Sequence, residues 1–173
     1  MQAFFLARLG AAGVLLAVLG SCGGTSGGGA GGSGFENRYA VARNALETGQ
    51  YDRARRTYLD LIDEAGPLAP RMRLEYAHAE LRAENFARAA QISGELAQTQ
   101  QGAARGAALS VRGTAQHELG VALLAEGRTD AAVAQLRAAQ AALAEVIGSY
   151  PDLDPLGSMA GRHAAIGARL ARL

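Results

Sequence analysis

The sequence predicts an all-α fold built from about three helix-turn-helix repeats and closed by a C-terminal capping helix. Alanine is the most frequent residue, and the 173 residues include only four prolines and no tryptophan, a composition that favours helices. Apolar side chains also recur every three or four residues, as on one face of a helix, for example at Leu119 and Leu123 and again at Leu136, Ala139 and Leu143.

The first 21 residues predict an export signal. Arg8 supplies a positive charge, and residues 9–19 are apolar and uncharged, which suits a signal sequence but is short of the roughly 20 residues of a membrane span. The residues that follow, Leu19-Gly20-Ser21-Cys22, resemble the lipobox of bacterial lipoproteins. The resemblance implies cleavage before Cys22 and its acylation with palmitate-type chains; the alternative is an ordinary secretory signal cut near the same place.

Residues 22–35 are predicted to be the acylated cysteine and a flexible tether. Residues 23–34 include eight glycines and no large apolar side chain, so they should behave as a flexible coil with a reach of about 20 Å. By resemblance to sorted lipoproteins, Gly23 in place of an aspartate indicates the outer membrane, with the domain facing the periplasm; retention in the inner membrane is the alternative.

Three segments share the same order of helix end, turn and helix start. Each has a residue suited to the left-handed conformation that ends a helix, followed by an alanine that lets two helices approach closely. An aromatic residue also follows the turn in the first two segments. The turn residues are Gly49, Asn85 and Gly127, the aromatic residues are Tyr51 and Phe86, and the alanines are Ala54, Ala89 and Ala132.

This pattern resembles the tetratricopeptide repeat, a helix-turn-helix unit of 34 residues. The resemblance assigns residues 36–154 to the repeats and implies a right-handed superhelix whose first helices line the inner face. The family's aromatic near the start of the first helix is replaced by Arg38, Arg73 and Gln116. Spacing between the repeat alanines is 35 and then 43 residues, so extra residues around 98–106 should lengthen helices or form a loop.

Helical periodicity and turn residues place seven helices. The last follows Asp154-Pro155, a capping residue and a proline at the first helical position, and residues 155–173 are predicted to cap the repeats. Its expected apolar stripe is Leu156, Met159, Ile166, Leu170 and Leu173, with His163 on the same face. The predicted helices span residues 37–48, 52–65, 68–83, 86–99, 104–126, 129–148 and 155–172.

The sequence offers little for catalysis or for a cofactor. The three histidines lack the spacing of a metal motif, and Asp152 and Asp154 lack the later ligands of a calcium loop, so they are interpreted as turn and cap residues. Cys22 is the only cysteine, which excludes a multi-cysteine zinc site. Without Arg8, 16 arginines face 16 carboxylates, so nucleic acid is not an expected partner. We expect no enzyme activity, cofactor, metal or small-molecule substrate.

The expected function is therefore protein binding, as an adaptor in envelope, pilus or secretion assembly. Helical-repeat lipoproteins of tight-adherence pilus assembly and of the β-barrel assembly machinery are similar in layout. The alternatives are a structural or self-associating envelope lipoprotein and a regulator of peptidoglycan enzymes. By the resemblance, the inner groove that takes a partner protein or peptide would be lined by Tyr39, Arg43, Glu47, Arg71, Leu74, His78, Arg82, Thr114, His117 and Val121.

Overall fold

The computed structural model describes residues 32–173, which form seven α-helices, two short 3₁₀ helices and no strand. The predicted signal, Cys22 and most of the predicted tether lie outside the described residues. The α-helices are α1 (Gly32–Glu47), α2 (Tyr51–Glu64), α3 (Ala69–Arg82), α4 (Phe86–Thr99), α5 (Gly102–Ala125), α6 (Thr129–Ser149) and α7 (Ser158–Leu170); the 3₁₀ helices are η1 (Gly66–Leu68) and η2 (Pro151–Leu153).

The predicted all-α class is confirmed, and the helices follow the predicted ranges closely. The extra residues between the second and third units lengthen α5, which has 24 residues against 14 in each of α2, α3 and α4. Helix α1 begins at Gly32, inside the range predicted as tether. Helix α7 begins at Ser158, three residues later than predicted, because the Pro155-Leu156-Gly157 segment forms a turn with Gly157 at φ +69°.

Two of the three predicted left-handed turn residues are confirmed: Gly49 has φ +78° and Gly127 has φ +74°. The prediction for Asn85 is wrong. In the second unit Glu84 takes the left-handed conformation at φ +62°, and Asn85 has φ −79° at the start of α4. Asn85 is instead held by its side-chain amide, which donates to Glu80 Oε2 at 2.7 Å, so the turn geometry is kept although a non-glycine residue bears the strain.

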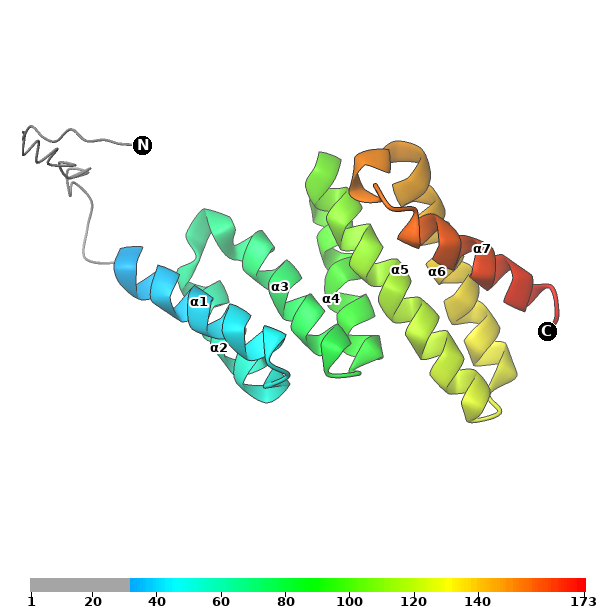
Figure 1. Cartoon of the computed structure of the whole chain (residues 1–173), viewed down its shortest axis with the longest axis horizontal. Coiled ribbons are helices and arrows are strands. Elements are labelled where there is room, and N and C mark those ends of the chain that lie inside the picture. The colour runs from blue at the N-terminus through cyan, green and yellow to red at the C-terminus, as the bar shows by residue number, and fades with distance from the viewer. Residues whose placement is uncertain (1–31) are drawn as a thin grey trace, which may run out of the picture.

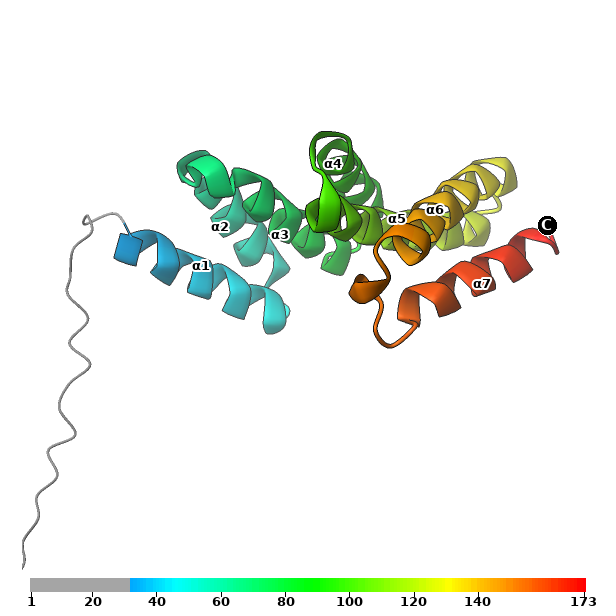
Figure 2. The same ribbon diagram turned by 90° about the horizontal axis from the view of Figure 1, so that it is seen from above.

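The helices form an extended array in which each one packs against the next in sequence (Figure 1). Figure 2, the view from above, places α4 on one side of the array and α1 and α7 on the other side, at its two ends. Because the connections are short, successive helices alternate in direction. The α2–α3, α4–α5 and α6–α7 connections consequently lie at the same end of the helices, the upper end in Figure 1.

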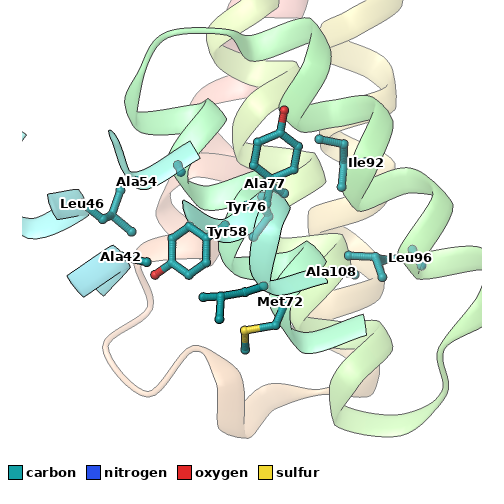
Figure 3. Packing of buried hydrophobic residues seen from close by; sticks show 14 of the residues in the cluster. Ala42, Leu46, Ala54, Tyr58, Met72, Tyr76, Ala77, Ile92, Leu96 and Ala108 are labelled. Atoms are coloured by element: carbon teal, nitrogen blue, oxygen red, sulfur yellow. The ribbon is translucent and has the colours of Figure 1, made fainter. Parts of the chain in front are cut away.

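The core is made of small and large side chains from neighbouring helices. The predicted close-approach alanines Ala54, Ala89 and Ala132 are all fully buried. Tyr58, which has no exposed surface, packs among Leu46, Met72 and other residues of α1–α3 (Figure 3). Close approach is most pronounced between α5 and α6, where a Cβ on Gly113 or Gly120 would lie 2.8 Å from a leucine Cγ of α6.

Helix α7 packs on α6 at the C-terminal end of the array. Ile166 is fully buried and contributes with Leu136 and Leu143 to a separate apolar cluster, against which Met159 and Leu170 pack. The prediction is wrong for two residues of the apolar stripe. Leu156 and Leu173 lie outside the helix and are 93% and 55% exposed. None of the helices within residues 32–173 is long and apolar enough to cross a membrane.

Candidate functional site

The residues predicted to line the inner groove lie on three helices that are alternate members of the array. Helix α1 carries Tyr39, Arg43 and Glu47, helix α3 carries Arg71, Leu74, His78 and Arg82, and helix α5 carries Thr114, His117 and Val121. The structure joins Tyr39 and Arg43 of α1 to α3, with His78 beside them, whereas His117 of α5 is covered by α7.

The α1 and α3 residues meet at Glu75, which the sequence interpretation missed. Its carboxylate accepts from the Tyr39 hydroxyl at 3.2 Å and from Arg43 Nη1 at 3.1 Å. Arg43 also donates to Glu47 Oε1 at 3.0 Å, and these carboxylates raise its pKa. Since the Glu75 side chain is only 13% exposed, the pair with Arg43 orders the face between the two helices. The positive charge of Arg43 is thus largely neutralised before any partner arrives.

Two aromatic rings pack together beneath this cluster. The Tyr39 ring meets the buried Tyr58 ring edge to face, with centroids 6.4 Å apart. The Tyr58 hydroxyl is buried and has no hydrogen-bond partner among residues 32–173, and its burial raises its pKa. Tyr58 thus belongs to the core that supports Tyr39 from below.

His78 lies beside the same cluster and is exposed to solvent. Its pKa is nevertheless lowered, chiefly because the surrounding protein removes water from the imidazole; Arg43 lowers it further and Glu75 opposes the shift. His78 therefore adds an exposed polar group to the α1–α3 face.

The prediction that His117 is an open groove residue is wrong. Its side chain is 16% exposed and lies under α7, where Arg162 Nη1 donates to its Nδ1 at 2.7 Å. Arg162 also pairs with Glu118 Oε1 at 2.5 Å. Accepting from an arginine requires a neutral ring with its proton on Nε2. The C-terminal helix thus occupies part of the face that α5 was expected to offer.

These surroundings also change the expected pH dependence. From their ordinary pKa, protonation of His78 and His117 should begin below about pH 6.5 and strengthen an acidic partner's binding. Desolvation lowers the pKa of both rings, with Arg162 adding to the effect on His117, so the charge develops only at lower pH. A partner of the exposed His78 therefore meets a ring that becomes charged only at lower pH than a free imidazole.

Arg71 and Leu74 belong to a separate feature, called here the edge pocket. It is a depression of 480 Å³ between the start of α3 and the α4–α5 turn. Apolar side chains form most of its walls, Leu68 at the rim is 52% exposed, and Arg71 and Gln100 supply polar groups. Its lining residues are Pro67, Leu68, Pro70, Arg71, Leu74, Glu75, Leu96, Gln100, Ala104 and Ala108.

The other predicted groove residues are on the surface without converging on the Glu75 cluster. The Arg82 guanidinium lies 5.9 Å from the centre of the Tyr51 ring, a cation–π contact near the α1–α2 turn. Thr114 and Val121 are half-buried on α5. Within residues 32–173, no three side chains of histidine, cysteine, aspartate or glutamate are grouped to hold a metal ion.

Asp154 caps α7 through its side chain, but the predicted placement is wrong, because Gly157 holds the position before the helix and Pro155 is not its first residue. Its carboxylate accepts from the backbone N–H groups of Met159 and Ala160 at 3.0 and 2.9 Å and from the Ser158 hydroxyl at 3.1 Å. These bonds lower its pKa and fix the start of α7.

Comparison of the chain with protein-family models, curated proteins and solved structures found no match.

Proposed function

We propose that this chain is a membrane-anchored, periplasm-facing adaptor that binds a partner protein or an extended peptide along the face formed by α1 and α3. The observation that carries the proposal is the contact of Glu75 on α3 with Tyr39 and Arg43 on α1, which forms a polar face beside the exposed His78. A polar face shared by two helices suits a ligand that lies across them, as extended peptides do on helical repeats.

The groups on this face suit a peptide chain chemically. His78 and the Tyr39 hydroxyl can bond to backbone amide groups, while the half-buried Leu74 on the same helix as His78 favours apolar contacts. Because Arg43 is already paired with Glu75, we expect neutral hydrogen bonds to carry more of the affinity than ion pairs. Binding should then depend less on salt than an arginine-led groove would.

The finer architecture is also part of the proposal. Packing of each helix on its neighbour in sequence, short turns at equivalent places and buried alanines after them support a tetratricopeptide-like right-handed superhelix. In that arrangement α1, α3 and α5 are the first helices of the three units, and α7 caps the third unit and covers part of its inner face.

The anchoring part of the proposal makes a separate prediction. Because Cys22 ends the apolar leader after two small residues, Cys22→Ala should abolish fatty-acid labelling of the protein in cells. The variant should be recovered either soluble in the periplasm or uncleaved in the inner membrane, as cell fractionation would show. Labelling that persists in this variant would contradict lipidation at Cys22.

Partner binding is tested with exposed residues of the proposed face. His78→Ala combined with Glu47→Ala should lower the recovery of partners that crosslink to the full-length parent in intact cells several-fold, without changing the melting temperature. The matched control is Arg56→Ala combined with Gln91→Ala, which alters exposed residues on α2 and α4. Equal loss in both double variants, or none in the first, would place binding elsewhere. His117→Ala is unsuitable, because losing the Arg162 contact would disturb α7.

A further inference from the structure

We propose that Leu156 of one copy of this chain inserts into the edge pocket of a second copy, so that two copies form a reciprocal dimer. The inference goes beyond the proposed adaptor function and does not use His78; Glu75, which also lines the edge pocket, is already paired with Arg43. It rests on an exposed leucine near an acidic side chain and on an apolar pocket with a basic side chain at its wall.

The leucine is presented on a fixed turn. Leu156 is 93% exposed and lies between Pro155 and the left-handed Gly157. On one side of this turn, Asp154 holds the first residues of α7 through its carboxylate. On the other side, Leu153 packs closely against Gly106 of α5. A side chain held out in this way loses little conformational freedom on binding.

The edge pocket can receive such a side chain. Its walls come mainly from proline, leucine and alanine residues, and its 480 Å³ exceeds the volume of one leucine side chain. The Leu156 side chain of the same copy does not fill it, because that side chain is almost wholly exposed. Insertion from a second copy would remove both apolar surfaces from water.

The charges beside the two features are complementary. Asp152, four residues before Leu156, is exposed and forms no ion pair within the described part of the chain. Arg71 at the pocket is likewise exposed and forms no ion pair within residues 32–173. A pair between Asp152 of one copy and Arg71 of the other would set the direction from which the leucine enters.

The position of the two features favours a closed dimer. Leu156 lies in the α6–α7 connection and the pocket lies between the α2–α3 and α4–α5 connections, all at one end of the helices (Figure 1). Two copies related by a two-fold axis at this end can exchange leucines reciprocally. Such an isologous contact closes on itself, whereas a contact between opposite ends would continue into a filament.

The first test uses crosslinking between two full-length chains that carry different tags and are expressed together. One chain carries Leu156→Cys and the other Leu68→Cys, and a short bis-maleimide is added to intact cells. We expect a mixed-tag dimer in several-fold greater yield than when Leu59→Cys replaces Leu68→Cys, since Leu59 is an exposed leucine on α2. Parent chains report any background from Cys22. Equal yields of mixed-tag dimer with Leu68→Cys and with Leu59→Cys would overturn the proposal. It would also be overturned if the Leu68→Cys chain crosslinked only to a different protein.

The second test exchanges the charges. Arg71→Glu or Asp152→Arg alone should reduce co-purification of the two tagged full-length chains several-fold, and both changes in the same chain should restore it. Leu156→Asp should abolish co-purification, without loss of helicity because the side chain is exposed. Failure of the parent chains to co-purify, or failure of the double variant to recover, would contradict the reciprocal contact. Neither result bears on partner capture at His78, which is measured separately.

Discussion

Gly120→Leu and Gly113→Leu should each lower the free energy of unfolding by about 3 kcal/mol, the upper part of the range for overpacking a core. A Cβ at Gly120 would lie 2.8 Å from Leu136 Cγ, and one at Gly113 the same distance from Leu143 Cγ. Both leucines are fully buried and cannot move aside. Thermal unfolding followed by circular dichroism would measure the loss.

The matched control is Gly148→Leu on α6. A Cβ at Gly148 meets nothing within 4 Å, so the same substitution there should leave stability unchanged or raise it by up to about 1 kcal/mol through the better helix propensity of leucine. A melting temperature that falls equally at Gly120 and Gly148 would mean that α5 and α6 do not approach as closely as described.

The same close packing applies at the alanines identified from the sequence. Ala54→Leu and Ala132→Leu should each cost about 1 to 3 kcal/mol, because both alanines are fully buried between helices. Unchanged melting temperatures in both variants, or appreciable strand in the circular dichroism spectrum, would contradict the repeat packing.

Glu80→Ala should lower the free energy of unfolding by about 2 kcal/mol, since it removes a buried carboxylate and leaves its partners unsatisfied. Glu80 is 4% exposed and accepts from Arg55 at 3.1 Å and from Asn85 at 2.7 Å, so it ties the α3–α4 turn to α2. Arg55 keeps Asp52 as a partner, which limits the loss. As a control, Glu95→Ala at an exposed site of α4 should change stability by less than about 0.5 kcal/mol.

The contribution of Glu80 has a definite pH dependence. Hydrogen bonds from Tyr76, Asn85 and Arg55 outweigh the desolvation that opposes them and lower its pKa. A carboxyl whose pKa is lower in the folded chain stabilises the fold above its unfolded pKa, about 4.3, and loses this effect as the pH falls through the folded value. Glu80→Gln should therefore lose less stability than the parent between pH 7 and pH 3.5. Parallel pH profiles for the two proteins would contradict this role.

The helices were predictable because alanine content, apolar periodicity and turn residues are local signals that agree with one another. The extra residues near position 100 were assigned to longer helices or a loop, and only the packing of α5 on α6 decides between these. The left-handed residue of the second turn was missed, because Glu84 has no intrinsic preference for that conformation. It occupies the place that Gly49 and Gly127 hold in the other turns, where the N–H of the next residue donates to a carbonyl of the preceding helix.

The candidate site was less predictable, because its contacts join residues far apart in sequence. Glu75 lies between predicted groove residues on α3, but its role depends on Tyr39 and Arg43, more than 30 residues earlier. His117 carries no local sign that Arg162 would cover it from α7, 45 residues later. Leu156 fits the helical periodicity of its segment, and only the turn at Gly157 leaves it exposed.

The adaptor proposal is tested most directly by mapping which face of the domain contacts other proteins in the cell. A photo-crosslinking amino acid placed in the full-length chain at His78 or Glu47 would probe the α1–α3 face, and one at Arg56 or Gln91 would probe exposed positions of α2 and α4. We predict that His78 and Glu47 yield the same partner, distinct from the chain itself, and that Arg56 and Gln91 do not. The same partner captured chiefly from Arg56 or Gln91 would contradict the proposed binding face.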